Sequence, residues 1–173
     1  MHQRVAGEKS TMANYAEMSL YVRLFMKKYP FSKFRIEPVP NSPLRKPLSA
    51  STVALVTTAG LCPPDQPPFN QKLKMGDPSW REIPNGIETR TLIESHRSQS
   101  FDHRGIEADR NLAFPLDRFR ELEAAGKIGR LNHRHFSFMG SIIGPRPLID
   151  QTAPEVARLL RADRVDVAFL TPL

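Results

Sequence analysis

The stretch TVALVT, residues 52–57, decides the fold of this chain. Its residues are apolar or β-branched, which is typical of a strand buried on both faces within a parallel sheet. Two later segments, residues 116–125 and 153–163, carry apolar side chains at helical spacing. Thr152 lies just before the second helix and Glu155 lies in its first turn, which is the T-x-x-E spacing of a capping box.

Three further strands are predicted, over residues 89–95, 134–139 and 165–173. Strands that alternate with helices through short connections predict an α/β fold with a mainly parallel sheet flanked by helices, in a Rossmann-like three-layer arrangement. The last run, VDVAFLTPL, is typical of a buried strand, and no later element covers it. We therefore expect the α/β fold to be incomplete at its C-terminus, because unpaired backbone inside a core is costly.

Two regions are predicted, an N-terminal arm of residues 1–48 and an α/β domain of residues 49–173. The arm contains an amphipathic helix over residues 13–28, followed by a strap in which prolines at positions 30, 38, 40, 43 and 47 oppose regular structure. The formal net charge of +7 lies mostly in this arm, which has nine Lys/Arg against three Asp/Glu. No nucleic-acid-binding motif accompanies that charge, so a solvated arm, or one that docks an acidic partner, is the better interpretation.

Several classes of protein are excluded by pattern. No run approaches the roughly 20 apolar residues of a membrane span, and residues 1–19 lack the apolar core of a secretory signal. A single cysteine allows no internal disulfide, which predicts a cytoplasmic protein. TTAGLCPP lacks the spaced glycines of a dinucleotide or ATP site, and no G-x-S-x-G motif occurs.

Polar loops follow the predicted strands, at the edge of the sheet where ligands bind in open α/β proteins. The side chains that these loops bring together in one candidate site are Cys62, Asp65, His96, Asp102, His103, Arg104, Ser141 and Thr171.

Each candidate also has a structural interpretation. A lone cysteine such as Cys62 is more often a small buried hydrophobe than a reactive thiol. His96, His103 and Asp102 make either an acid/base group or a polar surface loop, since their separation along the chain fixes no distance. His133 and His135 would share one face of a strand, but two ligands do not make a metal site, and we expect none.

Several blocks of this sequence, read in order, resemble the glycine/sarcosine/betaine and D-proline reductase selenoprotein B family. The blocks are VALVTTAGL with DQPPF, GDPSWREIP, SH followed by FDH, EADRNLAFPLDRFREL, HFSFMGSI, and TAPEVARLL followed by VDVAFLTPL. They run from about residue 30 to Leu173. Their order and number carry the resemblance, because no single block is diagnostic.

The resemblance implies an oxidoreductase subunit that reductively cleaves the C–N bond of an amine or amino acid. The implied substrates are of the glycine, sarcosine, betaine or D-proline class, and a thiol/disulfide couple supplies the electrons. In the best-known branches a selenocysteine attacks the carbon, and a partner subunit carries a pyruvoyl group in the D-proline and glycine branches. The charged positions within the family's blocks, Asp65, His96, Asp102 and Asp109, are expected to shape the substrate pocket. Cys62 stands where the family often has histidine, so we expect it to line the site.

In the family, the redox Sec or Cys follows the strand end that is here Leu170–Leu173. We therefore expect the nucleophile to follow Leu173 and this chain to lack it. The codon after Leu173 would be a UGA selenocysteine codon that was read as a stop. The alternative is a short, non-catalytic relative that binds a small amine or a partner protein.

Overall fold

The computed structural model describes residues 20–28, 36–96, 98 and 103–173. The chain divides into two compact units, residues 1–42 with 99–103, and residues 43–98 with 104–173. In the first unit, helix α1 (Leu20–Lys28) forms the end of the predicted helix, whose earlier residues lie outside the described residues. The expected absence of regular structure holds for the proline-containing residues 36–47, which form neither helix nor strand.

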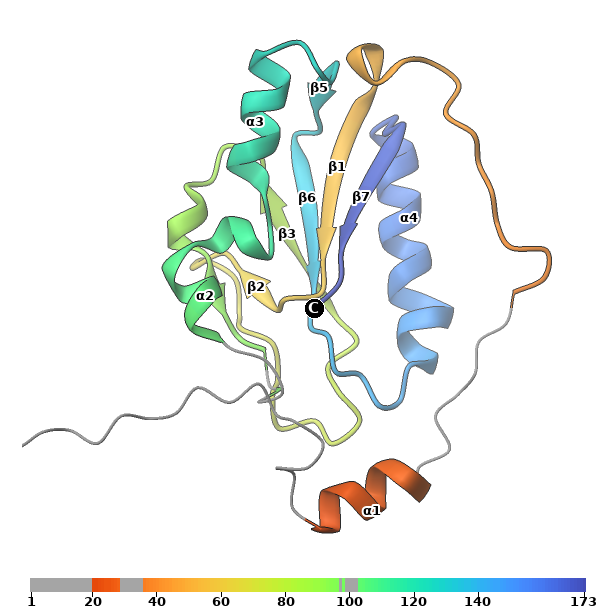
Figure 1. Ribbon diagram of the computed structural model, residues 1–173, viewed down its shortest axis with the longest axis vertical. Coiled ribbons are helices and arrows are strands. Elements are labelled where there is room, and N and C mark those ends of the chain that lie inside the picture. Colours follow the sequence, from red (N-terminus) through yellow and green to blue (C-terminus); the bar gives the residue numbers. More distant parts are fainter. Residues whose placement is uncertain (1–19, 29–35, 97, 99–102) are drawn as a thin grey trace, which may run out of the picture. The chain divides into compact units, whose positions relative to one another are not determined.

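The second unit is built on a sheet around the predicted strand β1 (Thr52–Thr57). Three strands pair with β1 in parallel: β5 (Arg130–Leu131), β6 (Arg134–Phe138) and β7 (Val167–Thr171). Strand β3 (Trp80–Pro84), which the sequence did not predict, runs antiparallel to β6. The α/β class is therefore confirmed with a mixed sheet, and the Rossmann-like three-layer arrangement stays a prediction (Figure 1).

Helices contact both faces of this sheet (Figure 1). On one face, Val156 of α4 (Ala153–Ala162) packs with Phe136 and Phe138 of β6. On the other face, Phe119 of α3 (Leu116–Ala124) lies 4.8 Å from the ring of Phe169 in β7, between ring centroids. The alternation of side chains along β6 and β7 thus supplies an apolar surface to each helix.

The segment between β3 and α3 differs from the prediction. Residues 89–95 do not form a strand of the main sheet: Thr89–Thr91 is a 3-10 turn, and β4 (Ile93–Glu94) pairs antiparallel with β2 (Leu61–Cys62). The reason is local, since the Thr91 hydroxyl donates to the carbonyl of Glu88 at 2.7 Å and closes a turn. The predicted loop 96–111 contains helix α2 (His103–Ala108) and a 3-10 turn at Arg110–Leu112.

One prediction near the C-terminus is also wrong. Thr152 does not cap α4: a π-helical turn (Leu148–Thr152) precedes the helix, and the Thr152 hydroxyl donates to the carbonyl of Pro78 at 2.7 Å. The last predicted strand forms as β7, and among the described residues it pairs with β1 on one edge only, with Leu170 65% exposed. Within the described ranges, no helix combines the length and apolar content needed to cross a bilayer.

The buried His135 side chain completes the hydrogen bonding of β1. The β1 residues 54–55 lie opposite residues 132–135, so the parallel ladder is interrupted between β5 and β6. The His135 imidazole fills this interruption: its Nδ1 accepts the N–H of Leu55 at 3.0 Å. Its Nε2 lies 3.3 Å from Asn85 Oδ1, which fixes the tautomer that carries its proton on Nε2.

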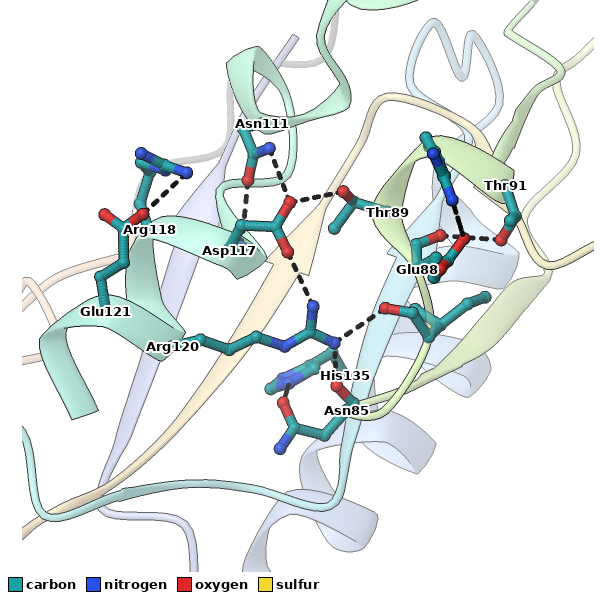
Figure 2. A network of polar contacts seen from close by, with 12 residues as sticks. Asn85, Glu88, Thr89, Thr91, Asn111, Asp117, Arg118, Arg120, Glu121 and His135 are labelled. Carbon is teal, nitrogen blue, oxygen red and sulfur yellow. Dashed lines mark hydrogen bonds and ion pairs between the residues drawn. The ribbon is translucent and has the colours of Figure 1, made fainter. Parts of the chain in front are cut away.

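Arg120 of α3 extends this polar chain toward the helix (Figure 2). Its guanidinium donates to the backbone carbonyls of Asn85 and Ile87 and to Asp117 Oδ1, the last at 2.7 Å. Asp117 in turn accepts from the Thr89 hydroxyl at 2.5 Å and from the Asn111 amide at 2.9 Å. The side chains of α3 are therefore tied to the 85–89 loop, which leads out of β3.

We predict that His135 makes stability fall in acid. Burial, with Arg120 and His133 nearby, lowers the pKa of His135 from 6.5 to about 3. The unfolded chain takes up a proton below pH 6.5 while the native chain does not, so the stabilisation present above pH 6.5 declines as the pH falls toward 3. We expect His135→Gln to lose about 1–3 kcal/mol at pH 7, since it leaves the Leu55 N–H poorly satisfied.

The measurement is denaturant unfolding at pH 7 and pH 4.5. Because one pKa unit corresponds to about 1.4 kcal/mol and pH 4.5 lies two units below 6.5, the gap in stability between wild type and His135→Gln should shrink by about 2.5 kcal/mol at the lower pH and close or reverse. His133→Gln is the control, because this histidine is exposed. A gap of equal size at both pH values would contradict a neutral buried His135.

Candidate functional site

A pocket of about 500 Å³ lies where the parallel strands β1, β6 and β7 end. The strands contribute Val56, Phe138 and Leu170, and the start of α4 with the preceding turn contributes Leu148 and Ala153. The surface of the pocket is almost entirely apolar. Its place agrees with the general position of ligand sites at the C-terminal ends of parallel strands.

Three hydroxyl-bearing residues line the pocket, Thr58, Ser141 and Thr171. Ser141 has φ +56°, a left-handed conformation that is uncommon for a residue with a side chain. Thr58 Oγ1 accepts the backbone N–H of Leu173 at 2.9 Å, which holds the end of β7 against the end of β1. Among the described residues, no charged side chain lines this pocket.

The GDPSW block forms a wall behind the pocket, a role that the sequence did not reveal. Gly76 has φ +93°, and a Cβ built there would lie 2.8 Å from Ile142 Cα, so the two loops touch backbone to backbone. Asp77 holds this block in shape by accepting the N–H groups of Asn70 and Ser79 at 2.7 and 2.9 Å. Burial raises the pKa of Asp77, but the hydrogen bonds from Ser79 and Asn70 outweigh it, and the net shift is downward.

His96 is buried directly behind Gly140, a pocket residue. A Cβ built at Gly140 would lie 2.8 Å from His96 Nε2, 3.0 Å from the carbonyl oxygen of Thr58 and 3.3 Å from that of Leu173. His96 Nδ1 accepts the backbone N–H of Ser98 at 3.1 Å, which assigns the proton of the neutral ring to Nε2. Gly140 is thus packed against an imidazole and two carbonyl groups, which leave no room for a side chain.

The predicted candidates Cys62 and Asp65 lie elsewhere. The Cys62 thiol is buried, with the carbonyl oxygens of Pro63, Gln66 and Pro67 between 3.1 and 3.5 Å from its sulfur. Burial raises the pKa of Cys62, although Arg81 acts in the opposite direction. Asp65 is exposed on the same proline-rich loop. Neither side chain lines the pocket.

The remaining candidates also separate. Asp109 is exposed and caps the turn at Arg110–Leu112 by accepting the N–H of Asn111 at 2.9 Å, and its pKa is lowered by the hydrogen bonds from Asn111. His103 and Arg104 begin helix α2, and Asp102 lies outside the described residues. His133 precedes β6, so it does not share a strand face with the buried His135 as the i, i+2 spacing predicted.

The sequence matches the glycine/sarcosine/betaine reductase selenoprotein B family over residues 18–172. The chain belongs to this family. The resemblance found from the sequence blocks is thereby confirmed. No solved structure shows a significant match to the chain.

Curated relatives carry the names of reductase subunits. The chain is 35% identical over 130 residues to the D-proline reductase subunit gamma of Acetoanaerobium sticklandii, covering 75% of this chain and 52% of that protein. It is 32% identical to the glycine reductase complex component B subunit gamma of Carboxydothermus hydrogenoformans, covering 77% of this chain and 30% of the relative. It is 32% identical to the betaine reductase complex component B subunit beta of Peptoclostridium acidaminophilum. This match covers 69% of this chain and 29% of the relative. The chain thus spans between about half and a third of the length of these relatives.

We predict that Cys62 is a poor nucleophile in the folded chain. Its thiol is buried and its pKa is raised, so the reactive thiolate is scarce at neutral pH. Alkylation by iodoacetamide at pH 8 should be at least about 100-fold slower in the native protein than in guanidinium, because a buried thiol reacts through opening. The chain has a single cysteine, so mass spectrometry reports this residue alone. Equal rates in the two states would return Cys62 to the list of candidate nucleophiles.

Proposed function

We propose that this chain carries the substrate-pocket walls of a reductase that cleaves the C–N bond of an amine or amino acid. The family match and the relatives' names support the reaction class. The observation that carries the proposal is the convergence of His96, the strand ends of β1 and β7, and the pocket at Gly140. The thiol/disulfide couple, the partner subunits with a pyruvoyl group, and the cytoplasmic location belong to the same proposal.

The nucleophile of this reaction is a selenocysteine or cysteine joined to Leu173. A residue attached there would start beside Gly140, because the Leu173 carbonyl borders the Gly140 position and the Leu173 N–H is bound by Thr58. Its selenolate or thiolate forms a bond to the α-carbon as the C–N bond breaks, and the nitrogen leaves with the bonding pair and takes up a proton. A thiolate then attacks the selenium or sulfur and forms a mixed Se–S or S–S bond as the bond to carbon breaks and the carbon takes up a proton. A second thiol releases the nucleophile by forming a disulfide, so two thiols supply the two electrons. Selenium suits this step because a free cysteine, with a pKa of about 8.5, is mostly protonated at neutral pH.

His96 supplies the proton to the leaving nitrogen. Its Nε2 carries the proton in the neutral tautomer and lies 2.8 Å from the position that a Cβ would take at Gly140. General acids of this kind act through a hydrogen bond to the departing atom, and they contribute roughly 10²–10⁴-fold in rate. Gly140 is required because any Cβ at this position would lie 2.8 Å from Nε2 and displace the imidazole.

A non-catalytic binding role is the second candidate. It is favoured by the position of Cys62, since the thiol of the described chain does not line the pocket. A binding protein of this kind would take up an amine or a partner and release no product.

Two measurements test the proposed reaction. The first is the DNA after codon 173, where an in-frame UGA or cysteine codon followed by an open frame is expected, and any other codon contradicts the position of the nucleophile. The second is amine release from glycine, sarcosine, betaine and D-proline under dithiothreitol, by the protein expressed from its own locus with its partner subunits. Substrate binding without amine release would favour the non-catalytic role.

We predict that His96→Gln lowers kcat by about 10²-fold or more while KM changes little, since a general acid acts in the transition state. The pH–kcat profile of the variant should lack the limb along which the wild-type enzyme loses activity as its general acid loses a proton. Gly140→Ala should produce a similar loss, whereas Gly86→Ala is its control because a Cβ at Gly86 meets open space. His133→Gln, an exposed histidine, is the control for His96→Gln. An unchanged kcat and pH profile in His96→Gln would exclude His96 as the proton donor.

A further inference from the structure

Thr58 connects the three parallel strands that end at the pocket, β1, β6 and β7. It follows directly after β1, and its backbone N–H donates to the carbonyl of Thr171 in β7 at 3.2 Å. Its carbonyl oxygen accepts the N–H of Gly140, just beyond the end of β6, at 2.7 Å. Its hydroxyl oxygen Oγ1 accepts the N–H of Leu173 at 2.9 Å. One residue therefore uses its N–H, its carbonyl and its side chain to hold two neighbouring strand ends.

The hydroxyl of Thr58 takes the place that a backbone carbonyl has in a regular ladder. Thr57 and Thr171 are partners in the parallel pairing of β1 with β7. The hydrogen bonds of a parallel ladder are evenly spaced, so the next one would run from the Leu173 N–H to the Thr58 carbonyl. That carbonyl accepts the N–H of Gly140, and the Thr58 side chain supplies the acceptor for Leu173. The path of the chain at Leu173 therefore depends on a side chain.

Two further features restrain the backbone around this bond. Pro172 has a fixed φ, so the chain between Thr171 and Leu173 has few conformations. The carbonyl oxygen of Leu173 packs against Gly140, 3.3 Å from the position that a Cβ would take there. Together with the Thr58 bond, these contacts restrain both the N–H and the carbonyl of Leu173. The position of any residue joined to Leu173 is restrained in the same way.

We propose that Thr58 is a positioning residue for the nucleophile and acts through the Leu173 N–H that its hydroxyl binds. This inference rests on the proposed function, which joins a selenocysteine or cysteine to Leu173, and it adds the group that holds the attached residue in place. Thr58 and Pro172 both line the pocket, so the attached residue starts at its edge. Attack on a carbon atom requires a defined distance and direction, and a misplacement of about 1 Å can cost roughly 10²-fold in rate. Loss of the Thr58 hydroxyl should therefore slow the reaction while the pocket remains.

Backbone order at Leu173 provides the first test, by NMR relaxation of the 173-residue chain. Thr58→Val keeps the shape of the side chain and removes the acceptor, whereas Thr58→Ser keeps the acceptor. The order parameter of Leu173 should fall below about 0.6 in Thr58→Val and stay above this value in the wild type and in Thr58→Ser. Thr91→Val is the matched control, because the Thr91 hydroxyl donates to the Glu88 carbonyl in a turn that does not line the pocket. Equal order at Leu173 in the wild type and in Thr58→Val would overturn the inference.

The effect on the reaction is measured in the protein expressed from its own locus with its partner subunits. We expect Thr58→Val to lower kcat for amine release by about 10-fold or more, with KM changed by less than about threefold, and Thr58→Ser to restore most of kcat. Circular dichroism melts show whether each variant is folded, and Thr58→Ala, which also lacks the hydroxyl, replaces Thr58→Val if that variant does not fold. An unchanged kcat in Thr58→Val would overturn the positioning role. A change in KM alone would also overturn it, because it would assign Thr58 to substrate binding.

The outcomes separate this inference from the proposed reaction. A wild-type complex that releases no amine contradicts the proposed reaction, and the positioning role is overturned with it, whatever the order at Leu173. Amine release at the same rate by the wild type and by Thr58→Val supports the reaction and overturns the positioning role alone.

Discussion

A side-chain nitrogen takes the place of a backbone acceptor at the centre of the sheet, and the rest of the domain depends on it. His135 Nδ1 receives the N–H of Leu55 where the ladder between β1 and its neighbours β5 and β6 is interrupted. The interruption leaves a backbone donor in the core, and a buried donor without a partner is destabilising. A neutral imidazole solves this problem, and its lowered pKa is the electrostatic consequence of that burial.

The polar chain that begins at His135 lies near the start of β6, whereas the pocket lies where β6 ends. Through Asn85 and Arg120 it ties β6 to α3, while Phe119 of that helix packs on β7. The three parallel strands then end together, and Thr58 binds the backbone of Leu173. An apolar pocket and a buried histidine meet at Gly140 because these strand ends are held in register.

Much of this fold was predictable because its elements carry strong periodic signals. TVALVT, RHFSF and the amphipathic α3 and α4 appear where apolar spacing predicted them. Strand β3 was missed because WREIP follows an irregular stretch and contains two charged residues. Arg81 donates to the carbonyl of Pro67, and Glu82 pairs with Arg134 of β6. Strand β7 also forms where the apolar run VDVAFLTPL predicted it, and among the described residues it pairs with β1 alone.

The candidate site was predicted in part. The rule that loops after parallel strands meet at one edge places Thr171 and Ser141 at the pocket and His96 behind it. The rule failed for Cys62 and Asp65, because the chain turns after β1 into the antiparallel β2–β4 pair and carries its proline loop away from the edge. It could not foresee Gly140 or the GDPSW wall, since backbone proximity leaves no pattern of side chains in a sequence.

The central claim is that the ends of β1, β6 and β7, with His96 behind Gly140, form the ligand site. Backbone amide NMR of the labelled chain, titrated with glycine, betaine and D-proline, tests it most directly. The account predicts the largest concentration-dependent shifts at Thr58, Gly140, Ser141 and Thr171, with Cys62 and Asp109 unmoved. Shifts centred on the proline-rich loop around Cys62, with none at Gly140, would contradict it.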